Sequence, residues 1–145
     1  MATITDVGTV LSAADAFVSN SYHEGWSVAA SEALWVGRPV VLSETGGSVE
    51  LVGAGSERGI VVVNACGGPL VADKRSIADP PPGAVAANQA RFAAALVSVA
   101  ENRERWRARS GDLRAYARST LSPAVIGRRY LEALRAVAQD AGTGG

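Results

Sequence analysis

Residues 19–50, which read SNSYHEGWSVAASEALWVGRPVVLSETGGSVE, decide the fold that we expect for this chain of 145 residues. Apolar residues at 16–18 lead into the stretch and a second apolar run lies at 39–42, so both segments predict β-strands. The segment between them predicts a helix over about 26–36. Gly37 is well placed to end that helix in a left-handed conformation. The stretch therefore predicts a strand, a turn, a helix and a second strand.

Two polar, glycine-containing turns follow the two predicted strands. A strand–helix–strand order builds parallel sheet, and in such sheets ligands bind beyond the carboxyl ends of the strands, where helix N-termini point. Residues 22–26 and 44–48 both belong to that edge. We therefore expect the polar groups of both turns to converge on one rim of the sheet.

Glu24 and Glu32 are the most informative pair on this rim. They are eight positions apart, which along a helix is a rise of roughly 12 Å. Two carboxylates placed in this way could hold the two ends of a polyhydroxylated ligand. Gly25 lets the backbone approach such a ligand, and free N–H groups at residues 26–28 could receive anionic oxygens. The pattern predicts a ligand that carries an anion flanked by hydroxyl groups.

The second turn contains Gly46 and Gly47, and Ser48 could cap a short helix that contains residues 50–52. An amide-rich turn of this kind suits phosphate or sugar oxygens. The plain alternative is a tight turn without a ligand. Chemistry alone leaves the two interpretations open.

The ordered series Asp15, Glu24-Gly25, Glu32-Ala33, Gly37, Pro39, Gly46-Gly47 and Glu50 resembles the donor-binding, C-terminal domain of retaining GT-B glycosyltransferases. More narrowly, it is similar to the group 1, family 4-like class, whose signature is two glutamates separated by seven residues. The resemblance continues through Arg58 and the strand after it. It implies an α/β fold: a partial Rossmann-like parallel sheet followed by a helical C-terminal segment.

The resemblance implies transfer of a sugar from a nucleotide diphosphate-sugar to an acceptor hydroxyl, with retention at the anomeric carbon. Glu24 would be the catalytic residue and would bind donor sugar hydroxyls, and Glu32 would bind the ribose. No metal or other cofactor is implied. The donor-binding residues would be Glu24, Gly25, Trp26, Ser27, Val28, Glu32, Gly46 and Gly47.

Each of these assignments has a plainer alternative. Glu32 could be an ordinary surface carboxylate of a helix, and Glu24 could be a favourable charge at a helix N-terminus. His23, the single histidine, is interpreted as a flanking turn residue rather than a base. Trp26 and Trp35 are expected to pack in the core, as large aromatic residues usually do.

Composition narrows the function classes. The formal net charge is zero, so nothing favours nucleic acid as a partner. The apolar stretches are short and interrupted by charges, which predicts no membrane span and no signal peptide. Cys66 is the single cysteine, and a cytoplasmic location is the simplest interpretation. No metal-ligand spacing and no nucleophile–base pair is evident.

Flanking segments complete the expected domain. Residues 4–14 predict a helix with Thr5 as a possible N-cap, and residues 59–63 predict a buried strand. Residues 64–83 predict a long loop, either a lid or interdomain surface or a plain surface insertion. We expect a partial nucleotide-sugar-binding unit at 1–83, helices packed on it at 84–139 and a disordered tail at 140–145.

The C-terminal helices carry three expected apolar faces and many arginines. A basic helical surface could contact the inner face of a membrane, but arginines paired with glutamates in solvent are the preferred interpretation. The predicted faces contain Val85, Phe92, Leu96 and Val99, then Trp106, Leu113 and Tyr116, and after Pro123 Ile126, Tyr130, Leu134 and Val137. The expected glutamate partners are Glu101, Glu104 and Glu132.

Compared with the family that it resembles, the chain is expected to be truncated on its N-terminal side. A complete enzyme adds an acceptor-binding domain and an Arg/Lys pair that neutralises the diphosphate. The alternatives are therefore a non-catalytic fragment or nucleotide-sugar-binding module that needs a missing N-terminal domain or a partner chain, and a nucleotide-sugar epimerase. A dinucleotide oxidoreductase is disfavoured because no Gly-x-Gly-x-x-Gly follows a strand.

Overall fold

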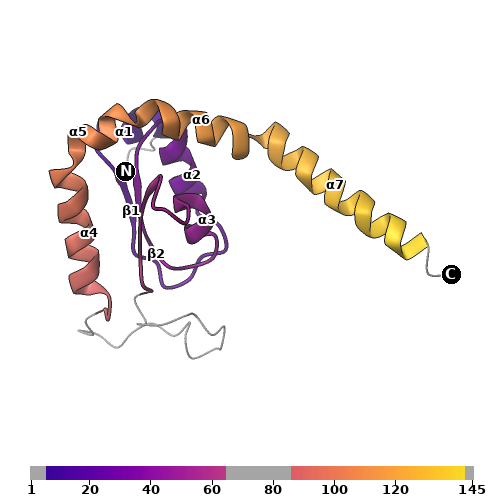
Figure 1. The fold of residues 1–145 in the computed structure, drawn as a ribbon, viewed down its shortest axis with the longest axis horizontal. Coiled ribbons are helices and arrows are strands. Elements are labelled where there is room, and N and C mark those ends of the chain that lie inside the picture. The colour runs from indigo at the N-terminus through magenta and orange to yellow at the C-terminus, as the bar shows by residue number, and fades with distance from the viewer. Residues whose placement is uncertain (1–5, 65–85, 143–145) are drawn as a thin grey trace.

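The computed structural model describes residues 6–64 and 86–142. Short helices and strands alternate in the first part, and helices alone form the second part (Figure 1). In chain order the elements are α1 (Val7–Ala13), β1 (Phe17–Ser19), α2 (Val28–Trp35), β2 (Val40–Ser43), α3 (Ser48–Val52), β3 (Gly59–Val62), α4 (Gln89–Glu101), α5 (Arg103–Ala108), α6 (Ser110–Thr120) and α7 (Pro123–Gly142).

The three strands form one parallel sheet in the order β1-β2-β3. Phe17 pairs with Val40 and Val40 pairs with Gly59, so the strands begin at the same level. β2 is buried along its whole length, as expected for the middle strand of a sheet that is covered on both faces. The predicted α/β fold with a partial Rossmann-like sheet is confirmed.

Helices cover both faces of the sheet. On one face, Leu34 of α2, Leu51 of α3 and Leu113 of α6 pack against Val40 and Leu42 of β2. The opposite face carries a second cluster made by Val41, Val62, Phe92, Ala95, Val99 and Trp106. Alternate residues of β2 thus point into two separate cores, which fixes the register of the middle strand.

The helix between the first two strands is held at both ends. Ser27 caps α2, because its hydroxyl accepts a hydrogen bond from the Ala30 amide at 3.3 Å. Gly37 has φ +81°, which confirms the predicted left-handed end of this helix. A Cβ atom at Gly37 would lie 2.2 Å from the Ser110 hydroxyl, so this glycine also lets α6 approach α2.

Two predicted helix caps are wrong. Asp6, not Thr5, caps α1, since its carboxylate accepts bonds from the Thr9 hydroxyl and the Thr9 amide. These bonds lower the pKa of Asp6. Ser48 lies inside α3 as its first residue, and Gly47 is the N-cap. The Ser48 hydroxyl accepts a hydrogen bond from the Thr45 amide, so it stabilises the turn before α3 and does not cap the helix.

The segment from Trp106 to Leu113 forms two helices instead of the single predicted one. Arg109 ends α5 and begins α6, which lets Trp106 enter one core and Leu113 the other. Tyr116 of α6 lies under Arg58, with 3.7 Å between the guanidinium carbon and the ring centre. The apolar faces of α4, α5 and α6 are therefore divided between the two sides of the sheet.

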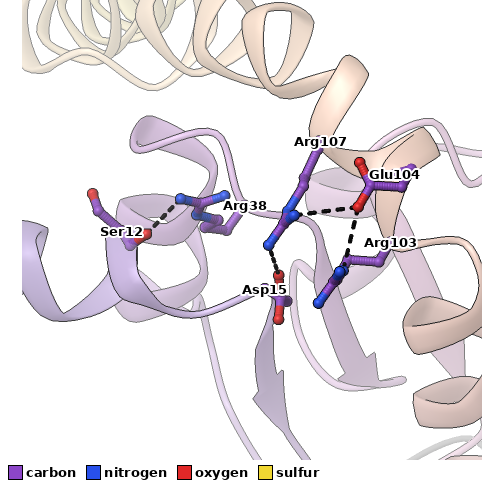
Figure 2. A network of polar contacts seen from close by, with 6 residues as sticks. All are labelled: Ser12, Asp15, Arg38, Arg103, Glu104 and Arg107. Carbon is purple, nitrogen blue, oxygen red and sulfur yellow. Dashed lines mark hydrogen bonds and ion pairs between the residues drawn. The ribbon is translucent and has the colours of Figure 1, made fainter.

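Charged pairs at the surface confirm only part of the expected pattern. Arg107 binds Asp15 at 3.1 Å and Glu104 at 3.2 Å, and Arg103 lies 3.5 Å from the same Glu104 carboxylate (Figure 2). The predicted ion pairs of Glu101 and Glu132 are absent from the described part of the chain. Asp15 therefore connects the start of β1 to α5.

Helix α7 extends away from the two cores (Figure 1). The predicted apolar residues Ile126, Tyr130, Leu134 and Val137 are all exposed. The helix continues to Gly142, so it includes residues 140–142 of the segment that we predicted as tail. No described helix is both long and apolar enough to span a membrane.

Several predictions fall on residues that the structure does not describe. They concern the loop after Asn64, Cys66 and Val85. The predicted division at residue 83 also lies outside the described residues and stays a prediction.

We predict that two Leu→Ala substitutions differ sharply. Leu113→Ala removes a fully buried side chain and should lower the free energy of unfolding by about 2–5 kcal/mol. Leu134→Ala, on the exposed face of α7, should change it by less than about 0.5 kcal/mol. Urea denaturation of both variants measures the difference. Equal losses would contradict the placement of α7 outside the core.

Candidate functional site

The two glycine turns pack directly against each other at the carboxyl edge of the sheet. The Gly47 amide donates a 3.0 Å hydrogen bond to the carbonyl of Gly25. A Cβ atom at Gly46 would lie 2.2 Å from the Glu24 and Gly25 carbonyl oxygens, and one at Gly47 would lie 2.3 Å from the Trp26 ring. The predicted convergence of both turns on one rim is therefore what the structure shows.

Gly25 differs from the two glycines that it contacts. It is exposed, its φ is not positive, and a Cβ atom there would meet nothing within 4 Å. Packing within the protein thus explains glycine at positions 46 and 47 but gives no reason for it at position 25. The space above Gly25 is open to a ligand that approaches the backbone.

Glu24 is half-buried and its carboxylate is held by two serines. Its Oε1 atom accepts a hydrogen bond from the Ser21 hydroxyl at 3.0 Å and a longer one from Ser19 at 3.5 Å. Ser19 and Ser21 also bond to each other at 2.9 Å. No hydrogen bond from the described residues reaches Oε2. One oxygen therefore fixes the carboxylate and the other can accept from a hydroxyl group.

Glu32 is exposed on the outer face of α2. It lines a cavity of about 430 Å³ together with Val28, Ser31 and Trp35 of the same helix. The other side of this cavity is the junction between α6 and α7. A second cavity of about 140 Å³ has Glu32 and Trp35 on one side and α1 on the other. Neither cavity includes Glu24. The expectation that both carboxylates face one cleft stays a prediction.

The tryptophans of this region are not core residues. Trp26 is 42% exposed and Trp35 is 39% exposed, which contradicts the prediction that both pack in the interior. The Trp26 indole N–H donates to the Ser31 hydroxyl at 3.0 Å, and its ring covers Gly47. Trp26 therefore joins the second turn to the outer face of α2.

Ser27 and Val28 have different environments at the start of α2. The Ser27 side chain is buried and committed to capping, so only its backbone is available to a ligand. Val28 is exposed and begins the helix. Amide groups in the first turn of a helix have no partner within the helix, so they can bind anions.

Asn64 and Asn88 were not predicted as site residues, but their side chains bond to backbone carbonyls of the rim and of the strand below it. Both are fully buried. The Asn64 amide donates to the Tyr22 carbonyl at 3.1 Å and the Glu44 carbonyl at 3.3 Å, so one side chain spans both turns. Asn64 follows β3 and Asn88 precedes α4, and a polar amide at such a position was the one sequence feature that could have indicated these residues.

Asn88 uses every hydrogen-bonding group of its side chain. It exchanges bonds with the Asn20 amide at 2.7 and 3.2 Å and donates to the Val63 carbonyl at 2.9 Å. Ser43 adds a 2.6 Å bond to the Ser21 carbonyl. The backbone behind Glu24 is therefore held by buried amides and a buried hydroxyl. Each of these groups would be costly to leave unpaired.

His23 is exposed beside Glu24 and makes no hydrogen bond in the described part of the chain. Within residues 6–64 and 86–142, no group of three or more His, Cys, Asp or Glu side chains is arranged to hold a metal ion. The polar groups that the described rim presents are carboxylates, hydroxyls and backbone amides.

Residues 3–74 match the family model described as Glycosyl transferases group 1. Comparison with the curated proteins and with the solved structures gave no match. The matched segment contains both glycine turns, Glu24 and Glu32. The match supports the group 1 glycosyltransferase family for this segment and glycosyl transfer as the general reaction.

We predict that alanine at Gly46 or Gly47 destabilises the fold, whereas alanine at Gly25 leaves its stability almost unchanged. Gly46→Ala and Gly47→Ala should each destabilise the fold by about 1–3 kcal/mol, because the new methyl group overlaps the facing turn. Gly25→Ala should alter stability by less than about 0.5 kcal/mol, because its methyl group meets open space. Thermal unfolding of the three variants measures this, and a large loss in Gly25→Ala would be the contrary result.

Proposed function

We propose that this chain binds a nucleotide diphosphate-sugar at the rim formed by the two glycine turns, as the donor-binding part of a retaining glycosyltransferase. Glu24 accepts hydrogen bonds from hydroxyls of the donor sugar, and Glu32 accepts them from the ribose. The family match of residues 3–74 supports glycosyl transfer, and the side-chain geometry supports these finer roles.

The carboxylate of Glu24 is the observation that carries the proposal. Two serine hydroxyls hold its Oε1 atom and leave Oε2 without a protein partner among the described residues. A carboxylate oriented in this way accepts hydroxyl donors without first losing rotational freedom. Hydrogen bonds to a charged acceptor are stronger than those between neutral groups. A sugar with several hydroxyls meets that requirement.

The backbone next to Glu24 suits the diphosphate. Gly25 leaves open space above the chain, and the first-turn amides of α2 follow at Val28 and Ala29. A helix N-terminus attracts anionic oxygens through its unpaired amides and its dipole. The diphosphate would thus lie between the sugar at Glu24 and the nucleoside nearer to Glu32.

The outer face of α2 is suited to a nucleoside. Val28 and Trp35 flank Glu32 and provide apolar contact area, and all three line the cavity of about 430 Å³. A carboxylate beside an exposed indole can accept from both ribose hydroxyls while the apolar side chains contact the ring atoms. This cavity supports Glu32 as the ribose ligand.

A nucleotide-sugar-binding module without catalysis is the second candidate. The observation that favours it is that neither of the two cavities lined by Glu32 includes Glu24. In this case, the chain would bind the donor but require a partner, either an N-terminal domain or another chain, to complete an acceptor site.

Isothermal titration calorimetry with a panel of nucleotide diphosphate-sugars tests donor binding. Glu24→Gln and Glu32→Ala should each weaken binding about tenfold or more, because each removes charge-assisted hydrogen bonds. Glu132→Ala removes another exposed helical carboxylate, on α7, and serves as the control that leaves affinity unchanged. Gly25→Ala should weaken binding although it does not affect folding.

The same samples separate the two candidates. Sugar transfer to an acceptor with the anomeric configuration kept, observed by NMR of the product, supports the retaining enzyme. Binding without transfer supports the module. If Glu24→Gln and Glu32→Ala bind every donor as tightly as the parent chain does, the proposed site is wrong.

A further inference from the structure

A cavity of about 500 Å³, the α7 pocket, lies between α3, the end of α6 and the first turns of α7. Its lining includes Trp26, Glu50 of α3, Tyr116 of α6 and Ile126 of α7. Leu121 lines both this pocket and the cavity of about 430 Å³ on α2, so the two adjoin. The volume is within the range of about 300–1,000 Å³ that is typical of small-molecule sites.

Trp26 gives the α7 pocket an aromatic surface that is fixed in place. Its indole N–H donates to the Ser31 hydroxyl at 3.0 Å and its ring covers Gly47, yet the residue is 42% exposed. Tyr116 adds a second ring, which Arg58 covers at 3.7 Å from the ring centre. A ring that is already held in position contacts a ligand at a low cost in conformational entropy.

Three polar side chains of the α7 pocket have bonding capacity left. Among the described residues, the Glu50 carboxylate and the Arg129 guanidinium have neither an ion pair nor a hydrogen bond. The Thr120 hydroxyl has a 3.4 Å contact with the Ser119 hydroxyl. A carboxylate accepts hydrogen bonds, a guanidinium donates them and a hydroxyl does both. Together these groups match neighbouring hydroxyls of one ligand.

The charges of the α7 pocket favour a neutral ligand. An anion attracted by Arg129 would be repelled by Glu50, and a cation would meet the reverse pair of forces. A wholly apolar ligand would remove water from both charges without replacing its hydrogen bonds, which is costly. The ligand that satisfies both conditions is uncharged, carries several hydroxyls and has an apolar face for the indole.

We propose that the α7 pocket binds a neutral pyranose ring and is a saccharide site separate from the donor rim. The C–H face of the sugar lies against Trp26, and its hydroxyls bond to Glu50, Thr120 and Arg129. This inference goes beyond the proposed function, because neither of the two carboxylates proposed to bind the donor lines the α7 pocket.

NMR of the full, isotopically labelled chain tests the proposal with methyl glycosides of glucose, galactose and mannose. At least one glycoside should shift the indole N–H signal of Trp26 and the methyl signals of Ile126. The indole signal of Trp35, which lines the adjoining cavity and not the α7 pocket, should stay in place. Absence of the Trp26 and Ile126 shifts with every glycoside would overturn the proposal.

Two substitutions and a matched control make the test specific. Arg129→Ala and Glu50→Gln should each weaken glycoside binding about fivefold or more, because each removes a charge-assisted hydrogen bond. Arg128→Ala removes the neighbouring exposed guanidinium of α7, which does not line the pocket, and should bind as the parent chain does. Circular dichroism verifies that the variants fold. Equal binding by all of them would contradict the proposed contacts.

Glu24→Gln separates this inference from the proposed function. It should weaken donor binding and leave glycoside binding unchanged. Glycoside binding that is lost in Glu24→Gln and kept in Arg129→Ala would place the sugar at the donor rim and overturn the inference. Glycoside shifts at Trp26 without binding of any donor would contradict the proposed function alone. Tighter binding of phenylalanine or adenosine than of every glycoside would show that the pocket does not select a sugar.

Discussion

The contact between the two glycine turns is the constraint on which the site depends. The Gly47 amide bonds to the Gly25 carbonyl, and Gly46 approaches so closely that no side chain fits between the turns. Each turn follows a strand of the sheet, and the contact joins the two loops into one surface. Glu24 and the start of α2 belong to that surface, so their relative positions are set before any ligand arrives. Preorganisation of this kind lowers the cost of binding.

Buried polar groups hold that surface to the sheet. Asn64 and Asn88 lie beneath the turns with no exposure to solvent, and their amides bond to carbonyls at the ends of the strands and in both turns. A buried amide that lost its partners would cost about 1–3 kcal/mol. The rim therefore has few alternative conformations. The close-packed positions at Gly46 and Gly47 serve folding, and Gly25 is the open position that we propose for ligand contact.

The sequence predicted the local order of elements well, because local chemistry decides it. The apolar runs of β2 and β3, and Gly37 after α2, identified two strands and the end of a helix to within about two residues. It also predicted that both turns lie on one rim, since parallel strands end at the same edge. The cap at Asp6 was missed and Ser48 was wrongly expected to cap a helix, because an aspartate or a serine can bond in several local ways.

Long-range packing explains the remaining misses. Trp26 and Trp35 were expected inside, but the interior beside α2 is filled by Leu34, Leu51 and Leu113, and the indoles stay at the surface. The apolar pattern of α7 predicted a covered face, whereas the described residues provide nothing to cover it. Asn64 and Asn88 form bonds across 20 to 68 positions of sequence, and no local pattern reveals such partners.

Hydrogen exchange of the Gly47 amide in the free chain tests the central claim most directly. If the two turns form one rigid surface, this amide should exchange as slowly as those of β2, because breaking its bond to Gly25 requires the rim to open. Exchange as rapid as that of an exposed loop, with β2 still protected, would show that the turns move independently and that the rim is not formed in advance.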